Sequence, residues 1–263
     1  QDPVPVILEN PELYELSQVL VPWYQKARRD LPWRHTTDPY RIWVSEIMLQ
    51  QTRVEAVKRY YARFMEALPN VNALANVEED KLLKLWEGLG YYNRVRNMQK
   101  AARQIMVDYN GTFPKTYEEI QSLTGIGNYT AGAISSFSFG LPYPAVDGNV
   151  LRVAARLNDD FTPITDAKQK KRTTGHFSEI TPEDRPGDFN QSLMELGATV
   201  CLPNGAPRCG SCPVQHLCLG YHHGHAEILP VRAAKKARRI EERTVLLVRC
   251  GEEVGIRRRP KTG

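Results

Sequence analysis

Two carboxylates stand out because of the residues around them. Glu46 lies in the otherwise apolar stretch VSEIMLQQT. On a helix its neighbours three and four positions away would be Ile42, Trp43, Leu49 and Gln50, none of which is basic. A carboxyl group among apolar side chains loses hydration, which raises its pKa. The pattern predicts an acid that keeps its proton near neutral pH and can act as a general acid.

Asp147 precedes the apolar-periodic segment GNVLRVAARL, so its simplest role is the N-cap of a helix. A cap and a catalytic carboxylate are compatible, because backbone N–H groups at a helix N-terminus favour the ionised form. We therefore expect Asp147 to stay charged while Glu46 stays protonated. Enzymes that cleave glycosyl bonds use such a pair, with one protonated carboxyl group as the acid and one ionised carboxylate that stabilises positive charge.

Four cysteines form a cluster with the spacing C-x7-C-x2-C-x5-C, namely Cys201, Cys209, Cys212 and Cys218. Clustered thiols in an intracellular chain indicate metal ligation. Zinc commonly uses two separated C-x2-C pairs, whereas one tight pair with asymmetric arms favours an iron–sulfur cluster. Zinc stays open as the alternative. The fifth cysteine, Cys250, lies apart, and the six histidines show no spacing that indicates a metal site.

Two glycine-containing segments could contact nucleic acid. LTGIGNYTAGA predicts two helices joined by a Gly-x-Gly turn at Gly125 and Gly127. The N-terminus of the second helix would bind phosphate oxygens without reading sequence, although an ordinary interhelical turn is equally compatible. GLGYYNRVRN combines aromatic side chains, which can wedge between bases, with arginines that can hold phosphates. Its alternative is a helix C-cap followed by a solvated basic face.

The elements that must position these groups are predominantly helical. Apolar periodicity predicts helices over residues 10–27, 76–90, 93–111, 116–125, 128–140, 147–157 and 188–201, and either two helices or one kinked helix over 38–68. Asn10 is a candidate cap, and Thr116 with Glu119 has capping-box spacing. No strand pair is indicated before residue 240. Residues 243–260 predict a strand, a turn and a second strand, which we interpret as the start of a β-containing domain that has been cut off.

Composition narrows the class of protein. The chain has 263 residues, 41% hydrophobic and 25% charged, as is typical of globular proteins. Its net charge of +5 favours a polyanionic partner without establishing one. No membrane span or signal peptide is indicated. We therefore expect an intracellular protein, located in the bacterial cytoplasm or, in a eukaryote, in the nucleus or mitochondrion.

These motifs in this order resemble the helix-hairpin-helix DNA glycosylases related to endonuclease III, and most closely the adenine DNA glycosylases of the MutY type. The likeness extends from LPWR at Leu31 to the start of the β tail, and its most specific stretches are SEIMLQQT, LTGIGNYTAGAI, AVDGNV and the cysteine cluster. The endonuclease III branch usually carries no glutamate at the position of Glu46, so this residue points to adenine.

The resemblance implies an all-α fold of two helical lobes, with a helical glycosylase core over residues 1–228. A six-helix lobe would cover roughly 32–140, with the hairpin at 123–132. A cluster lobe would combine the N-terminal helix with residues 141–228. A linker at 229–240 would follow, and then the opening strands of a truncated Nudix-like domain at 241–263.

The implied activity is removal of adenine mispaired with 8-oxoguanine or guanine in double-stranded DNA, by a monomer that flips the base out of the duplex. Glu46 would protonate adenine N7, and Asp147 would stabilise the resulting sugar cation. Lyase members of the family carry a lysine at the position of Tyr129, so the resemblance implies a monofunctional enzyme.

The resemblance also assigns roles to further residues. Gln51 and Tyr91 would wedge into the duplex, and Arg34, Leu49 and Gln191 would surround the flipped base. Other DNA contacts would come from Gln50, Gly125, Gly127 and Asn149. The four clustered cysteines would hold a [4Fe–4S] cluster, although their first spacing is seven residues where six is typical. A T·G mismatch glycosylase and a non-catalytic DNA-binding iron–sulfur scaffold stay as alternatives.

Overall fold

The computed structural model describes residues 11–203, 205–233, 240, 242 and 247–256. They group into two compact units, one that ends at Ala233 and one that follows it. The candidate cap Asn10 lies outside the described residues, and so do residues 243–246 of the predicted first strand. None of the described helices is long and apolar enough to cross a membrane.

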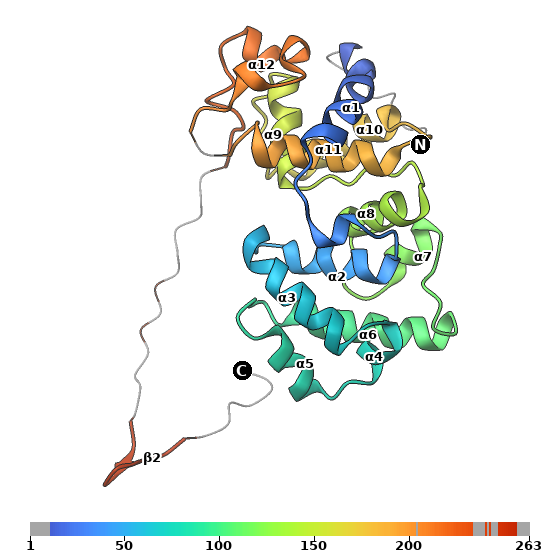
Figure 1. Ribbon diagram of the computed structural model, residues 1–263. Coiled ribbons are helices and arrows are strands. Elements are labelled where there is room, and N and C mark those ends of the chain that lie inside the picture. Colours follow the sequence, from blue (N-terminus) through green and yellow to red (C-terminus); the bar gives the residue numbers. More distant parts are fainter. Residues whose placement is uncertain (1–10, 204, 234–239, 241, 243–246, 257–263) are drawn as a thin grey trace. The chain divides into compact units, whose positions relative to one another are not determined.

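The first unit is helical, as predicted (Figure 1). Its helices are α1 (Leu16–Ala27), α2 (Pro39–Leu49), α3 (Val54–Ala67), α4 (Val71–Asn76), α5 (Glu79–Trp86), α6 (Asn93–Asp108), α7 (Tyr117–Ser122), α8 (Asn128–Phe139), α9 (Gly148–Leu157), α10 (Ala167–Ile180), α11 (Pro186–Thr199) and α12 (Leu219–His222). Short 3-10 turns lie at η1 (Pro11–Glu15), η2 (Pro32–Arg34), η3 (Cys209–Ser211) and η4 (Gln215–Leu217). The segment predicted as two helices or one kinked helix forms two, α2 and α3.

Helices α2 to α8 enclose one hydrophobic core, which lies below the other helices in Figure 1. Trp43, Phe64 and Trp86 are fully buried at its centre, and the rings of Phe64 and Trp86 meet edge to face. The capping box predicted at Thr116 and Glu119 is present and starts α7. The short loop between α7 and α8 is the predicted hairpin, so this lobe presents both Glu46, on α2, and the N-terminus of α8.

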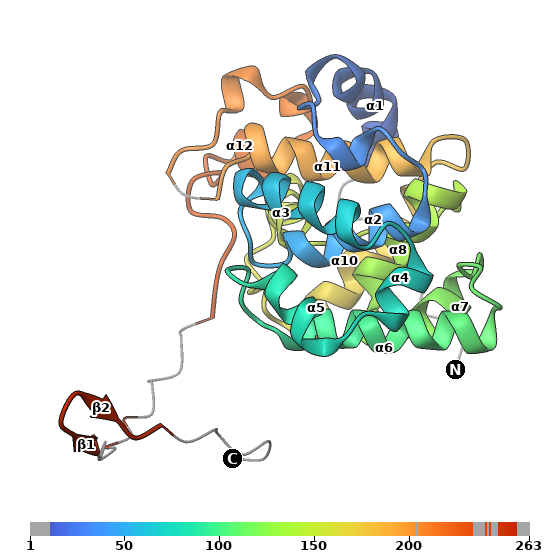
Figure 2. The same ribbon diagram turned by 60° about the horizontal axis from the view of Figure 1, so that its bottom comes forward.

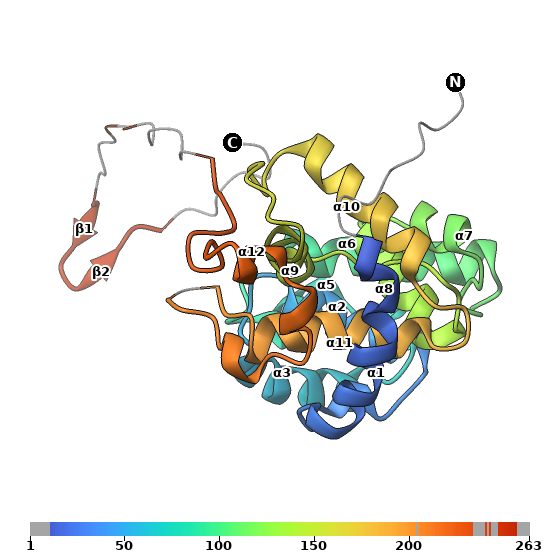
Figure 3. The same ribbon diagram turned by 90° about the horizontal axis from the view of Figure 1, so that it is seen from above.

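A second core forms where α1, α9, α10 and α11 pack together (Figures 1 and 3). Leu16 and Leu20 of α1 are fully buried against Phe189 and Leu193 of α11. Chain-distant segments therefore build this lobe, because α1 comes from the N-terminal part of the chain and the others come after α8. Figure 2 shows α1 and α11 side by side from another direction.

Buried contacts join the two cores and fix the segment before Asp147. On α11, Asn190 donates from Nδ2 to the carbonyl of Tyr143 (2.8 Å), and its Oδ1 accepts from the backbone N–H of Ala145 (3.0 Å). On α8, Gly132 allows the backbone at Pro144 to pack directly against the helix, since a Cβ at Gly132 would lie 2.1 Å from the Pro144 carbonyl oxygen. The start of α9 is therefore held at a defined place opposite α2 and α8.

The described part of the second unit contains one antiparallel pair, β1 (Arg249–Cys250) and β2 (Glu253–Val254). The register places Arg249 opposite Val254, and all four residues are exposed. The strand, turn and strand predicted here are present in this short form. Assignment of this unit to a Nudix-like domain, and the expected domain boundaries, stay predictions.

Candidate active site

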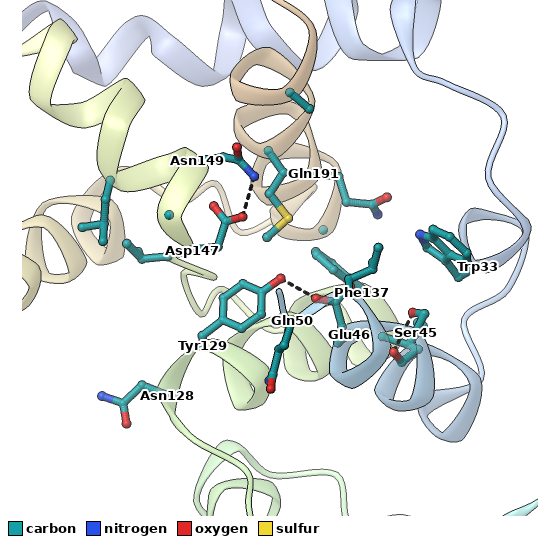
Figure 4. A pocket seen from close by; sticks show the side chains of 18 of the residues that line it. Trp33, Ser45, Glu46, Gln50, Asn128, Tyr129, Phe137, Asp147, Asn149 and Gln191 are labelled. Carbon is teal, nitrogen blue, oxygen red and sulfur yellow. Dashed lines mark hydrogen bonds between the residues drawn. The ribbon is translucent and has the colours of Figure 1, made fainter. Parts of the chain in front are cut away.

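A cavity of about 1530 Å³ opens between the two cores, and the segments from both lobes line it (Figure 4). Nine of the residues predicted from the sequence line this cavity: Arg34, Glu46, Leu49, Gln50, Gln51, Tyr129, Asp147, Asn149 and Gln191. Tyr91, Gly125 and Gly127 lie outside it. The folded chain thus brings together residues from α2, α8, α9 and α11.

Glu46 is 5% exposed and lies on the last turns of α2. Burial raises the pKa of its carboxyl to about 7, the hydrogen bond from Tyr129 lowers it, and the charge of Asp147 raises it further. The Tyr129 hydroxyl donates to Oε2 of Glu46 (Figure 4). Burial raises the pKa of Tyr129 well above its ordinary value, so this phenol stays a donor. The expected protonated acid is therefore physically reasonable at neutral pH.

Asp147 is the N-cap of α9, as expected: its Oδ1 accepts from the backbone N–H of Val150 (2.8 Å). Its Oδ2 accepts from Nδ2 of Asn149 (2.7 Å), so Asn149 orients the carboxylate in the pocket (Figure 4). The cap favours the ionised form of Asp147, as expected, but it is not the largest influence on the pKa of this carboxyl. Burial raises the pKa, and the bonds from Val150 and Asn149 only oppose that rise.

A buried ion-pair network behind the pocket escaped the sequence analysis. Glu195 of α11 is 0% exposed and accepts from Arg29 Nε (2.8 Å) and Arg34 Nη2 (2.7 Å). Burial acts against ionisation, but the hydrogen bonds from these arginines lower the pKa of Glu195 to about 2. The signal was available in SLMELGAT, where a glutamate stands among apolar and small residues as Glu46 does.

This network also holds the expected base-pocket residues. Arg34 lines the pocket, and its guanidinium is committed to Glu195 and to the carbonyl of Arg29 (3.0 Å). Tyr24 of α1 donates its hydroxyl to Oε1 of Gln191 (2.7 Å). The side chains of Arg34 and Gln191 are consequently fixed before any ligand arrives, which lowers the entropy lost on binding.

The two residues expected to wedge into DNA share an uncommon backbone conformation. Gln51 has φ 60 and Tyr91 has φ 46, which places both in the left-handed region that non-glycine residues rarely adopt. Both are exposed, Tyr91 at 66%. Left-handed backbone at an exposed polar or aromatic residue is characteristic of functional loops.

Arg94, at the start of α6, joins the two loops that carry these residues. Its Nη1 donates to the carbonyls of Ile47 (2.8 Å) and Gln50 (2.5 Å), just before Gln51. Its Nη2 donates to the carbonyl of Leu89 (3.0 Å), just before Tyr91. The fork geometry of one guanidinium therefore sets the spacing of both loops.

The hairpin before α8 uses its two glycines differently. Gly125 has φ 81, and a Cβ there would lie 2.7 Å from Cβ of Asn97. Gly127 is the N-cap of α8 and has open space where a Cβ would project. The first N–H groups of α8 have no carbonyl partner within the helix, so this end can bind an anion.

The four clustered cysteines surround one small cavity next to α9. All four cysteines line this single space, so one metal centre placed in it would be within reach of all four thiols. Burial raises the pKa of Cys212 to about 12 and that of Cys218 to about 11, so only a bound metal would keep them as thiolates. The four thiols around one cavity fit a metal centre with thiolate ligands.

A family profile described as the HhH-GPD superfamily of base excision DNA repair proteins matches residues 44–183. The match includes the hairpin, Glu46, Tyr129 and Asp147. The chain belongs to this superfamily.

Curated members of the superfamily that are similar to the chain carry the name adenine DNA glycosylase. The Mus musculus protein is 42% identical over 81% of this chain and 44% of its own length. The protein of Buchnera aphidicola is 40% identical over 85% of this chain and 64% of its length. The Homo sapiens protein is 42% identical over 76% of this chain and 38% of its own length. The chain thus spans 38% to 64% of the length of these relatives. Their similarity confirms the resemblance found in the motifs.

Solved structures of superfamily members share the fold. A thermostable thymine-DNA glycosylase has a TM-score of 0.73 at 28% identity and covers 81% of this chain and 98% of its own. A trapped covalent intermediate of endonuclease III with DNA has a TM-score of 0.69 at 25% identity, covering 83% and 99%. The two-lobed helical fold is therefore that of the superfamily.

Proposed function

We propose that this superfamily member is a monofunctional adenine DNA glycosylase, which removes adenine mispaired with 8-oxoguanine or guanine from double-stranded DNA. The observation that carries the proposal is the pair of carboxyl groups in one pocket: Glu46, with a pKa near 7, faces Asp147. The similarity to curated adenine DNA glycosylases supports adenine as the base. Because the reaction occurs on DNA, the enzyme would act in the bacterial cytoplasm, or in a nucleus or mitochondrion.

In the proposed mechanism Glu46 is the general acid. Tyr129 donates to Oε2, which leaves the other carboxyl oxygen of Glu46 to carry the proton towards the base. Protonation of adenine N7 turns the base into a neutral leaving group, and the glycosidic bond breaks with its electron pair going to the base. General-acid catalysis contributes about 10²–10⁴-fold to a rate.

Asp147 would stabilise the positive charge that develops on the sugar as the bond breaks. Its two oxygens are oriented by Val150 and Asn149 and cannot turn away. Burial raises its pKa by destabilising the carboxylate, and a nearby positive charge would offset that cost. A pre-oriented carboxylate stabilises such a charge more strongly than mobile water does. Water then completes the hydrolysis.

Strand cleavage by imine formation requires an amine, and Tyr129 offers a phenol. We therefore propose hydrolysis without a Schiff base. Borohydride should trap little enzyme on DNA, and strand breaks at the product should require added base or heat. Efficient trapping through a lysine would overturn the monofunctional assignment.

DNA would lie across the mouth of the pocket. Gln51 and Tyr91 are exposed on loops at fixed spacing and would fill the space that the flipped base leaves. The N-terminus of α8 would bind a phosphate of the same strand. We propose that the enzyme acts as a monomer.

We propose a [4Fe–4S] cluster on Cys201, Cys209, Cys212 and Cys218. When bound, such a cluster supplies a redox-active and structural cross-link between the end of α11 and the turns that follow. Metal analysis should give four irons for each chain, and no zinc should be bound by these four cysteines. Serine at any of these cysteines should lower the iron content, whereas Cys250→Ser, at an exposed cysteine in the second unit, should not.

The experiment that tests the proposed function is single-turnover excision on A·8-oxoguanine, A·G and T·G duplexes. We expect adenine release from the first two, and a loss of about 10²-fold or more in Glu46→Gln with DNA binding retained. Release of thymine in place of adenine would favour the mismatch alternative, for which the likeness to a thymine-DNA glycosylase is the specific observation. Binding without release of any base would favour the non-catalytic scaffold.

A further inference from the structure

We propose that Asp159, His223 and His225 form a binding site for one zinc ion, separate from the four cysteines. The three side chains each direct a metal-binding atom to one point, and these atoms all lie within 4.8 Å of one another. Nδ1 of His223 lies 2.7 Å from Oδ2 of Asp159. Nδ1 of His225 lies 3.0 Å from Oδ1 of the same carboxylate.

The distances fit a metal with little rearrangement. Zinc binds imidazole nitrogen and carboxylate oxygen at about 2.0–2.2 Å, so tetrahedral ligands lie about 3.4 Å apart. The nitrogens are now 2.7 and 3.0 Å from the carboxylate, within hydrogen-bonding distance. Outward side-chain movement of less than about 1 Å would admit the ion, which would displace the shared imidazole protons to solvent.

The backbone on both sides of the site is held in place. Asp159 follows α9 with φ 53, and its N–H donates to the carbonyl of Arg156 (3.3 Å). The His223 N–H donates to the Leu219 carbonyl (2.9 Å), and the His225 N–H donates to the Gly220 carbonyl (2.7 Å). Donors held by ordered backbone lose little entropy when they bind a metal.

The exposure of the two histidines and the nitrogen and oxygen donors favour a solvent-open site for a cation of intermediate softness, such as zinc. The side chains of His223 and His225 are 54% and 39% exposed, so an ion can enter and keep a water ligand. The Phe161 ring packs edge to face on His225, with ring centroids 5.2 Å apart, and fixes its orientation. Two imidazoles and one carboxylate suit zinc better than an iron–sulfur cluster, which takes thiolates.

The ion would connect two segments that lie 64 residues apart in the chain. One is the end of α9, and the other begins at α12, directly after Cys218. Its binding would therefore hold down the turn that follows the cysteine cluster. A ligand that binds only the folded chain raises stability in proportion to the logarithm of its concentration over Kd.

The test uses the full chain with its cysteine-bound iron in place and any histidine tag removed. After dialysis against a mild chelator, zinc is added at micromolar concentration and bound zinc and iron are counted by mass spectrometry. We expect one zinc for each chain and a rise in Tm of about 5 °C at a hundredfold excess over Kd. Asp159→Asn and His225→Gln should lose both effects. The matched control is His222→Ala, since this neighbouring ring contacts the His216 carbonyl and not Asp159.

X-ray absorption at the zinc edge identifies the ligands directly. Nitrogen and oxygen neighbours at about 2.0–2.1 Å without sulfur support the site. Sulfur at about 2.3 Å would mean that zinc has entered the cysteine cluster, and would overturn the proposal. Unchanged zinc binding in Asp159→Asn and His225→Gln, or no binding by the parent chain, would show a hydrogen-bonded carboxylate and histidine cluster only.

Discussion

At the scale of single residues, the burial that raises the pKa of Glu46 also affects stability. Below pH 4.5 the carboxyl is protonated in folded and unfolded chains alike. Between pH 4.5 and about 7 the unfolded chain loses this proton while the folded chain keeps it, so stability falls as pH rises. Above about pH 7 the folded chain holds a buried carboxylate at full cost.

We therefore predict that Glu46→Gln becomes more stable than the parent as pH rises. The advantage should be small at pH 4.5 and reach about 3 kcal/mol in the free energy of unfolding by pH 8. Denaturant unfolding of both proteins across this range measures it. A difference that does not change with pH would mean that the pKa of Glu46 is ordinary.

Tyr129→Phe should move the pH dependence of excision. Removing the hydroxyl removes the hydrogen bond that lowers the pKa of Glu46, so that pKa rises further. Since the acid acts in its protonated form, single-turnover excision falls above this pKa, and the alkaline limb should shift to higher pH in the variant. Tyr109→Phe, at a half-buried tyrosine away from the pocket, should leave the limb in place. If the alkaline limb does not shift in Tyr129→Phe, the Tyr129 hydroxyl does not control the pKa of the catalytic acid.

At the scale of elements, the hairpin before α8 offers a matched pair of substitutions. Gly125→Ala should lower the free energy of unfolding by about 1–2 kcal/mol, because φ is positive and the new Cβ meets Asn97. Gly127→Ala should fold normally, because its Cβ would project into open space. It should weaken DNA binding severalfold if a phosphate occupies that space. Equal DNA affinity for Gly127→Ala and the parent would argue against an anion site at this helix end.

Arg94 is a positioning residue for the two loops that carry Gln51 and Tyr91. Arg94→Lys keeps the charge but cannot donate to both loops at once, so the loops should lose their fixed spacing. We predict that KM for the mispair rises about tenfold while kcat falls less. Fluorescence of 2-aminopurine at the target position should report weaker base flipping.

The control for this prediction is Arg96→Lys, on the same helix, where the side chain is exposed and pairs with Glu79. It should leave both kinetic constants unchanged. A merely structural role for Arg94 would lower the amount of folded enzyme and so kcat alone. That result would exclude the proposed positioning of the loops.

At the scale of the whole molecule, the proposed catalysis requires that the two lobes hold Glu46 and Asp147 at a fixed separation. Asn190→Ala should leave the Tyr143 carbonyl and the Ala145 N–H without their buried partner. We predict a loss of about 2–4 kcal/mol in the free energy of unfolding. Excision by the folded fraction should fall while DNA affinity is retained. Asn158→Ala removes a hydrogen bond to the Ala154 carbonyl within α9, away from the junction of the two cores, and should affect neither.

The sequence alone determined the features that depend on near neighbours in the chain. Helix periodicity, the capping box at Thr116 and the cap at Asp147 follow from contacts within a few residues, and the structure confirms them. The raised pKa of Glu46 was predictable for the same reason, since its apolar neighbours lie on its own helix. The superfamily could be identified because its motifs are likewise short and continuous.

Only the tertiary structure decided the features that depend on distant segments. Glu195 meets Arg29 across 166 residues, and no local pattern announces that pair. The pKa of Asp147 rises because the folded chain buries it, which its own helix could not reveal. His223 and His225 show no metal spacing along the chain, because their third partner, Asp159, arrives from the end of α9. Burial and long-range charge are properties of packing, so they become defined only when the lobes close on each other.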